Sequence, residues 1–166
     1  MSTLPPVFRP DGTVTAGNCC PLNDGAAAVV IMSDTKAAEL GLTPLARIIS
    51  TGVTGLSPEI MGMGPVEATR KALALAHMSI SDIDLVEINE AFAAQVIPSA
   101  RRLGIGLDKL NINGGGIAIG HPFGMTGARI TSTLINSLRH HDKQIGLETM
   151  CVGGGQGMAM VLERLS

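Results

Sequence analysis

The fold of this chain is decided by one stretch, Glu148-Thr149-Met150-Cys151-Val152-Gly153-Gly154-Gly155-Gln156-Gly157-Met158-Ala159-Met160-Val161-Leu162. Residues 148–152 and 158–162 are predicted strands, and the glycine-rich residues 153–157 join them. Two strands with so short a connection are antiparallel neighbours if they pair directly. We therefore expect a sheet that contains at least one antiparallel pair.

The rest of the chain alternates predicted strands with predicted helices, which indicates an α/β fold with a largely parallel sheet. Ser33 or Asp34 can cap one helix and Gly41 can end it, while Pro98 is expected to kink another. Strands are predicted at residues 25–33 (buried), 45–51, 83–88 and 110–113, helices at 35–40, 65–77, 90–103 and 126–139, and coil or loop at 1–24 and 52–64.

The composition is rich in glycine and poor in charge. Glycine accounts for 21 of the 166 residues, and charged residues for 16%, whereas an average chain has about 25%. Since so few charges cannot coat a monomer comfortably, we infer a large protein–protein or domain–domain interface and expect a homo-oligomer. The net charge of −2 gives no electrostatic reason to bind nucleic acid or an anionic membrane.

No targeting or metal-binding pattern is present in the sequence. Apolar runs stay below the roughly 18 residues of a membrane span, and residues 1–6 lack the regions of a signal peptide. Cys19, Cys20 and Cys151 are an odd number without disulfide-framework spacing, so a reducing, cytoplasmic setting is the simplest interpretation. The cysteines and histidines lack metal-ligand spacing, and we expect neither a metal nor a permanently bound cofactor.

Asn89 falls where a predicted strand ends and a predicted helix begins, within Asn89-Glu90-Ala91-Phe92-Ala93. In an open α/β sheet this edge binds ligands, and an amide can position a water or a carbonyl. The alternative is structural, because asparagine is among the best residues for capping a helix N-terminus.

His121 lies between a glycine-rich turn and a helix start, within Gly120-His121-Pro122-Phe123-Gly124. Backbone N–H groups and the helix dipole make that place positive, which favours a neutral imidazole able to accept a proton from a thiol. The alternative is a loop histidine that is hydrogen-bonded to the backbone.

Cys151 ends a predicted strand and precedes three glycines, whose backbone N–H groups can bind a developing oxyanion. A thiol there could move protons or attack carbon. The alternative is a small buried hydrophobic residue, which is the usual role of a free cysteine. The other glycine run, residues 114–116, matches neither a phosphate loop nor a dinucleotide-binding fingerprint.

Together and in this order, the three stretches resemble the C-terminal half of the thiolases, the acyl-CoA acyltransferases of fatty acid and lipid metabolism, including β-oxidation. Asp11-Gly12-Thr13-Val14-Thr15-Ala16-Gly17-Asn18 and Leu22-Asn23-Asp24-Gly25-Ala26-Ala27 extend the resemblance, which covers the chain from about Phe8. It implies that residues 1–24 end a CoA-covering loop region and that residues 25–166 form the thiolase C-terminal domain. It also implies a mixed five-stranded sheet with helices on both faces.

The resemblance implies a role for each site residue in the reversible conversion of 3-ketoacyl-CoA and CoA to acyl-CoA and acetyl-CoA. In thiolases a cysteine from the first half of the polypeptide is acylated. His121 would take the proton of that thiol, and Asn89 would position a water in the first oxyanion hole. Cys151 would be the acid and base of the second step, and the N–H of Gly153 would help form the second oxyanion hole.

Substrate contacts are implied as well, with coenzyme A as a substrate. Phe92 and Met61 would line the acyl pocket. Cys20 stands where thiolases often have a serine beside the pantetheine, and a thiol is the weaker hydrogen-bond donor. We expect Asn89, His121 and Cys151 to converge within about 10 Å, the scale of one reacting centre.

The acylated cysteine is not found in this sequence, so we expect a half-enzyme that needs an N-terminal thiolase half and is inactive without it. The helix at 126–139 is the best candidate for burial against that half. One alternative is a non-enzymatic CoA- or lipid-binding module or a truncated fragment. Another is half of a ketoacyl synthase, which usually pairs a nucleophilic cysteine with two histidines or with histidine and asparagine; Cys151 argues against it.

Overall fold

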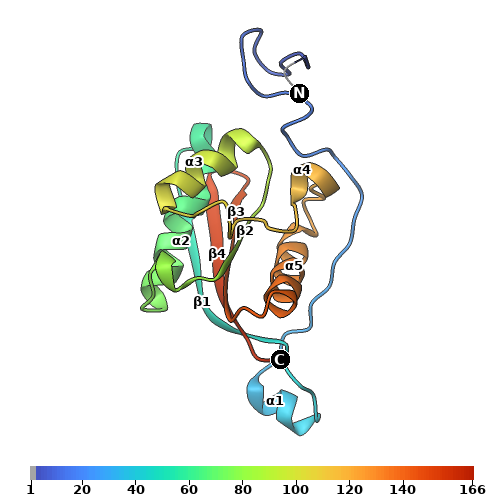
Figure 1. Ribbon diagram of the computed structural model, residues 1–166, viewed down its shortest axis with the longest axis vertical. Coiled ribbons are helices and arrows are strands. Elements are labelled where there is room, and N and C mark those ends of the chain that lie inside the picture. The colour runs from blue at the N-terminus through green and yellow to red at the C-terminus, as the bar shows by residue number, and fades with distance from the viewer. Residues whose placement is uncertain (1–2) are drawn as a thin grey trace.

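The computed structural model describes residues 3–166 and contains one mixed sheet between helices (Figure 1). Met1 and Ser2, the start of the predicted N-terminal coil, lie outside the described residues. The sheet order is β1-β4-β3-β2. The strands are β1 (Ala46–Gly55), β2 (Leu85–Ile88), β3 (Ile145–Val152) and β4 (Gln156–Arg164).

The strand pairing confirms the predicted mixed sheet. β3 and β4 pair as an antiparallel hairpin, with Cys151 opposite Gly157 and Val152 opposite Gln156. β2 runs parallel to β3, and β1 is antiparallel to β4. Because β2 and β3 are parallel, their carboxyl ends lie at the same edge of the sheet.

Helices cover both faces of the sheet, as predicted. α2 packs on β1 and β4 and contacts α3, whereas α5 packs on β2 and β3 on the opposite face (Figure 1). α1 lies apart at the lower end of the view. The helices are α1 (Asp34–Glu39), α2 (Gly64–Leu75), α3 (Ala93–Leu103), α4 (Gly116–Ile119) and α5 (Thr126–His140), with 3-10 turns η1 (Pro58–Met63) and η2 (Ile80–Asp82).

Local sequence signals explain several helix boundaries. The Ser33 hydroxyl accepts the Lys36 N–H and caps α1, and Gly41 follows that helix with a φ of 64°. Gly104 ends α3 with a φ of 71°. Pro98 lies inside α3, which continues to Leu103 with one fewer main-chain hydrogen bond.

Side chains along β2 point alternately to the two faces of the sheet, so the core has two parts. Val86 and Ile88 face α2 and α3, where they join the larger apolar cluster. Leu85 faces α5 and packs with Leu134 and Leu138. The next side chain on that face is Glu87, so the contact between the sheet and α5 turns polar toward the carboxyl ends of the strands.

Two buried carboxyl groups form this polar part of the core. Glu87 and Glu148 are opposite each other in the parallel pairing of β2 and β3, and Glu87 is only 2% exposed. Burial raises the pKa of each carboxyl to about 7; the Arg129 charge lowers the pKa of both, and the Thr131 hydrogen bond lowers that of Glu148. The core therefore holds a proton equilibrium near neutral pH.

The predicted five-stranded sheet has one strand too many. Residues 25–33, predicted as a buried strand, run extended along the outside of α5 without joining the sheet (Figure 1). Val30 and Ile31 are 85% and 72% exposed. The apolar run correctly indicated an extended segment, but periodicity does not say which surface a strand packs against.

The predicted loop at 52–64 was also wrong in part. β1 continues through Gly55, and η1 follows it. The glycines in this stretch serve close packing, because a Cβ at Gly52 would overlap the Ala68 carbonyl of α2. The predicted strand at 110–113 is reduced to one parallel bridge between Leu110 and Val86.

Replacement of Gly157 by alanine is expected to destabilise the fold. A Cβ there would overlap the backbone of Gly64, where α2 begins against β4, and neither backbone can move aside cheaply. Gly157→Ala should lower the free energy of unfolding in urea by about 1–3 kcal/mol. Gly124→Ala, where a Cβ meets no atom within 4 Å, is the matched control. Equal stability of the two variants would contradict this packing.

Stability should fall as pH rises through the range of the buried carboxyls. A folded pKa of about 7 for Glu148, above its ordinary value of 4.5, favours folding below pH 4.5, and this contribution is lost as pH rises through 7. Glu148→Gln should match the wild type at pH 5 and be more stable at pH 8 by on the order of 2–3 kcal/mol in urea unfolding. The exposed Glu39→Gln is the control. An unchanged pH profile in Glu148→Gln would contradict burial of an ionisable carboxyl.

Candidate active site

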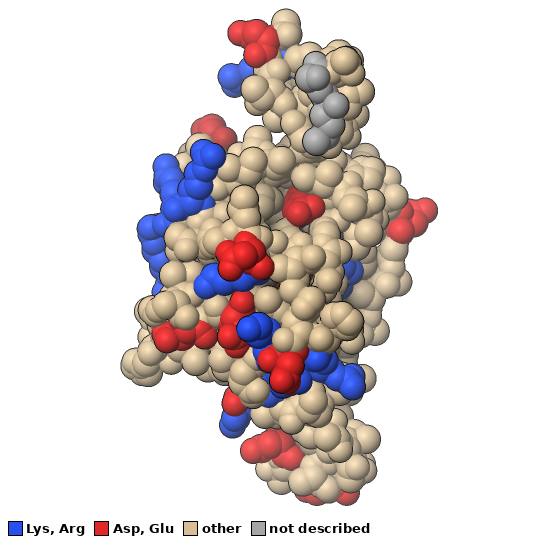
Figure 2. Space-filling model, in the orientation of Figure 1, with Lys and Arg blue, Asp and Glu red and all other residues tan. Residues whose placement is uncertain are grey.

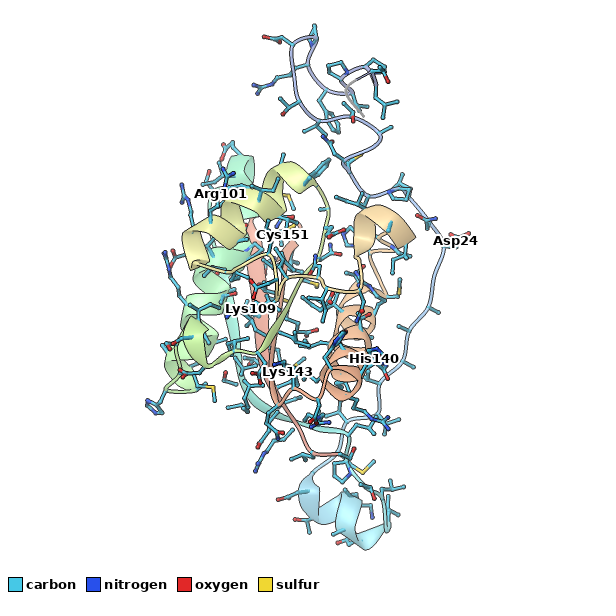
Figure 3. The ribbon with its side chains drawn as sticks, in the orientation of Figure 1. Asp24, Arg101, Lys109, His140, Lys143 and Cys151 are labelled. Carbon is cyan, nitrogen blue, oxygen red and sulfur yellow. The ribbon has the colours of Figure 1, made fainter. Side chains whose placement is uncertain are left out.

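The candidate site lies at the edge of the sheet where β2 and β3 end together. The Asn89 N–H, directly after β2, donates to the Thr149 carbonyl of β3 at 3.0 Å. Cys151 is the second-last residue of β3 and lies in the upper half of the sheet, below α3 (Figure 3). The parallel pairing therefore brings two residues that are 62 positions apart to one edge.

Asn89 is fully buried and does not cap a helix. α3 begins at Ala93 with Phe92 as its N-cap residue, so the capping interpretation is excluded. Its Nδ2 lies 3.2 Å from His121 Nε2. Its Oδ1 accepts a hydrogen bond from Arg129 Nη2 at 3.5 Å. A buried amide with both ends engaged is a positioning group.

His121 follows α4 and is anchored through its other ring nitrogen. Nδ1 lies 2.6 Å from Thr126 Oγ1, and that hydroxyl donates to the Pro122 carbonyl at 2.9 Å. With its one proton directed at the Pro122 carbonyl, the Thr126 hydroxyl accepts from Nδ1–H. The lone pair of the neutral ring is therefore on Nε2, which faces Asn89.

The charge state of His121 agrees with the sequence prediction, although the cause differs. Burial lowers the pKa of His121, and the Arg129 guanidinium lowers it further. The sequence predicts the positive field of a helix start, whereas the structure supplies desolvation and the full positive charge of Arg129. The imidazole is neutral at pH 7 and can accept a proton.

Cys151 is a buried thiol. Burial raises its pKa, and the neighbouring Cys20 thiol raises it further, against a backbone hydrogen bond that lowers it. Cys151 is thus protonated at neutral pH. This state suits a proton donor better than an attacking thiolate.

The glycine turn after β3 exposes a backbone donor. Gly154 and Gly155 have φ values of 82° and 87°, which other residues rarely adopt. Within residues 3–166 the Gly153 N–H has no hydrogen-bond acceptor. It is available to an external oxygen.

The predicted substrate-contacting residues surround this edge. The Cys20 N–H donates to the Ala91 carbonyl at 3.0 Å, and Cys19 forms an antiparallel bridge with Phe92. The Phe92 ring lies edge-on to Phe8, with 5.9 Å between centroids. The N-terminal arm, residues 3–24, therefore contacts the chain just beyond Asn89. Met61 is half-buried on η1, which packs against α3 and β3.

Sequence reasoning missed the residues that support the site. Asn111 holds the last residue of β2 through its side chain, which accepts the Ile88 N–H at 2.8 Å and donates to the Ile88 carbonyl at 2.9 Å. The Glu90 carboxylate accepts from Asn111 and from the Ile117 N–H of α4. Arg129 reaches into the site from α5. The available signal was a charged residue, Glu87, inside an otherwise apolar strand.

The described residues offer no cluster of three or more histidine, cysteine or acidic side chains for a metal. No helix among them is long and apolar enough to cross a membrane. On the face in Figure 2 most atoms belong to uncharged residues, and basic groups gather at its upper left, where Figure 3 labels Arg101.

The sequence of this chain matches one family of known proteins. Residues 42–164 match the family described as "Thiolase, C-terminal domain", and residues 1–35 match "Thiolase, N-terminal domain". The chain is 55% identical over 166 residues to an acetyl-CoA acetyltransferase of Escherichia coli and 56% identical over 170 residues to a 3-ketoacyl-CoA thiolase of Photobacterium profundum. These matches cover 100% and 99% of the chain but only 42% and 44% of the relatives.

Solved structures agree over nearly the whole chain. Human mitochondrial 3-ketoacyl-CoA thiolase is 47% identical and superimposes with a TM-score of 0.97, covering 99% of this chain and 42% of that one. A structure of human mitochondrial 3-ketoacyl-CoA thiolase in complex with CoA is 46% identical and has a TM-score of 0.93, with the same coverage. The Bacillus anthracis acetyl-CoA acetyltransferase is 51% identical and has a TM-score of 0.96. From its sequence match, its fold, and the buried Asn89 and Cys151 with the half-buried His121 at one sheet edge, this chain belongs to the thiolase family.

Proposed function

We propose that this chain supplies the C-terminal catalytic half of a thiolase, which exchanges acyl groups between CoA thioesters. The observation that carries the proposal is the Asn89–His121 contact just after β2, at the same sheet edge as Cys151 near the end of β3. A neutral imidazole with an unprotonated Nε2 and a protonated buried thiol are a base and an acid at one edge. A non-enzymatic binding module has no need for this pairing.

In the cleavage direction His121 acts first. Its Nε2 takes the proton of the nucleophilic cysteine as that sulfur attacks the 3-keto carbon of the substrate. The bond between C2 and C3 then breaks, and the electron pair remains on C2 of the departing acetyl-CoA. Asn89 positions the water that stabilises the oxyanion on the acyl group.

Cys151 acts on the leaving fragment and on the incoming thiol. Its Sγ donates a proton to the C2 carbanion, which completes acetyl-CoA. The resulting thiolate takes the proton of an incoming CoA thiol, whose sulfur attacks the acyl-cysteine and releases acyl-CoA. The expelled cysteine thiolate takes its proton back from His121. The Gly153 N–H stabilises the enolate oxygen of the acetyl-CoA thioester. Burial keeps Cys151 protonated for the first of these transfers.

The substrate lies along the edge formed by the N-terminal arm. Phe92 and Met61 line the acyl pocket, and Cys20 lies beside the pantetheine. Coenzyme A is a substrate here, as the human relative crystallised with CoA supports. The three free cysteines support a reducing, cytoplasmic location, and the activity fits lipid breakdown such as β-oxidation.

The nucleophilic cysteine comes from a first thiolase half outside these 166 residues. The chain spans about 42% of the length of the relatives it matches, and its residues 1–35 match the N-terminal domain family. The exposed Val30 and Ile31 lie in that part of the chain. We propose that residues 25–33 pair as a strand with the sheet of the first half, and that the assembled halves associate into oligomers.

A hollow beside residues 25–33 also fits binding of the first thiolase half. It has a volume of about 650 Å³ and lies between residue Ala27 and the outer face of α5. Ser132, Thr133 and Asn136 of α5 line it. Small and polar side chains such as these permit a close approach by another helix, so α5 is the surface for the first half.

The isolated 166-residue chain should not cleave acetoacetyl-CoA or longer 3-ketoacyl-CoA. Adding a separately expressed first thiolase half should give CoA-dependent cleavage, followed by loss of the 3-ketoacyl-CoA absorbance. Cys151→Ala should then reduce kcat by about 10²–10⁴-fold, because the acid and base are lost, while mass spectrometry still detects acylation of the first half.

Cys19→Ala, which removes a half-buried thiol of the arm, is the control and should retain most activity. Robust cleavage by the isolated chain would show that the nucleophile has been assigned wrongly. Full activity of the mixture with Cys151→Ala would remove that residue from the mechanism.

Strand addition by residues 25–33 should be visible in hydrogen exchange. The amides of these residues should exchange fast in the isolated chain and slow down when the first half binds, since they enter a ladder of hydrogen bonds. Val30→Asp should weaken binding of the first half at least tenfold in titration calorimetry, whereas Leu107→Asp, equally exposed but in the loop after α3, should not. Unchanged exchange at 25–33 in a formed complex would contradict the strand.

A further inference from the structure

Arg129 is a buried cation that the steps above do not use. It lies in the first turn of α5 and its side chain is 11% exposed. Nη1 lies 3.8 Å from the Glu87 carboxylate, and Nη2 donates to Asn89 Oδ1 at 3.5 Å. A guanidinium placed between a buried carboxylate and the amide that contacts His121 is well located to act on the proposed base.

The orientation of the Asn89 amide is the property that Arg129 controls. An asparagine can turn either its oxygen or its NH2 group toward a neighbour, and the two ends have the same size. A guanidinium has only donors, so the end that faces Arg129 must be the oxygen. The NH2 group is then left to face His121 Nε2 and must be the donor in that contact.

The other side of the imidazole is compatible with the same tautomer. With its proton on the Pro122 carbonyl, the Thr126 hydroxyl accepts from Nδ1–H, but it can also turn and donate to an unprotonated Nδ1. The choice of tautomer therefore depends on the chain of hydrogen bonds through Arg129 and Asn89. In the selected tautomer the Nε2 lone pair accepts from the Asn89 amide, and Nε2 is the ring atom that can take up a proton.

Glu87 keeps Arg129 in place by charge. No hydrogen bond within residues 3–166 satisfies Arg129 Nη1 or Glu87 Oε2, so the pair is held by electrostatic attraction when Glu87 is ionised. Its neighbour Glu148 does not compete when protonated. Thr131 has one hydroxyl proton and lies 2.8 Å from the Gly127 carbonyl and 2.9 Å from Glu148 Oε2, and its hydrogen bond to Glu148 lowers the pKa of that carboxyl.

All charged groups around the imidazole are thereby accounted for. Glu87 lies across the cluster from Arg129, Glu148, whose pKa burial also raises to about 7, lies on the neighbouring strand, and Glu90 is held by Asn111 and α4. Arg129 is the one basic side chain of the described residues that contacts Asn89.

We propose that Arg129 is a positioning residue for the proposed base: by binding the Asn89 oxygen it turns the amide NH2 toward His121 and selects the ring tautomer in which Nε2 is unprotonated. The inference rests on the proposed function for its catalytic meaning, but the tautomer itself is a property of this chain. Arg129 touches neither substrate nor the reacting atoms.

The test is nitrogen NMR of the chain with 15N-labelled histidine, with and without substitutions at Arg129. Wild-type His121 should show a protonated Nδ1 and an unprotonated Nε2. Arg129→Gln presents both a donor and an acceptor to Asn89, so the amide can turn and the two tautomers should mix. The His121 pKa should also rise, because the cation that lowers it is gone.

Arg129→Lys is the conservative rescue, because an ammonium has only donors and keeps the charge. It should retain the wild-type tautomer and the lowered pKa. His77, which follows α2 on the other face of the sheet, should be unchanged in every variant and serves as the internal reference. Arg139→Gln, at the exposed end of α5, is the matched control. If Arg129→Gln fails to fold with Glu87 unpaired, the double variant Glu87→Gln/Arg129→Gln removes both charges and carries the same tautomer test.

A single Nδ1–H tautomer in the folded Arg129→Gln or double variant would overturn the proposal. With the first half added, Arg129→Gln should lower kcat by at least about tenfold with KM unchanged, and the acid limb of the pH profile should move to higher pH. If the wild-type mixture is active but Arg129→Gln keeps a single His121 tautomer, the positioning role alone is refuted. A confirmed tautomer without activity in the wild-type mixture would refute the proposed function alone.

Discussion

The parallel pairing of β2 with β3 is the constraint on which the rest of this structure depends. Its register sets Glu87 opposite Glu148 inside the core and lets both strands end at one edge. The same register carries Asn89 and Cys151 to that edge. A shift by one residue would turn the carboxyls toward the apolar cluster under α2 and would move Asn89 away from α5. Fold and site therefore share one determinant.

The contact between α5 and the sheet combines stability with chemistry. Its far end is apolar, around Leu134 and Leu138, and supplies the hydrophobic driving force. Its near end holds Glu87 and Arg129, and a buried ion pair without good hydrogen bonds adds little or nothing to stability. Such a pair is costly to keep in the core of a small domain. Its position beside Asn89 gives a reason for it that packing does not.

Much of the fold follows from the sequence, because its signals are local. Capping by Ser33, the stop at Gly41 and the glycine hairpin after Cys151 each predicted an element that the structure contains. The errors have a common physical cause. The run 25–33 and the glycines near Gly52 were interpreted from local pattern, whereas their paths depend on surfaces remote in sequence: the outside of α5 for the first, and the backbone of α2 for the second. The supporting side chains were missed for the same reason, since hydrogen bonds such as Arg129 to Asn89 join residues 40 positions apart.

The central claim is that the Asn89–His121 pair and Cys151 serve one reacting centre. A crystal structure of the chain assembled with a first thiolase half and soaked with CoA tests it most directly. The account predicts that the CoA sulfur lies within about 4 Å of both Cys151 Sγ and His121 Nε2, with the Gly153 N–H directed at the thioester position. A CoA thiol that ends elsewhere, for example in the hollow beside Ser132 and Asn136, with Cys151 out of reach, would contradict it.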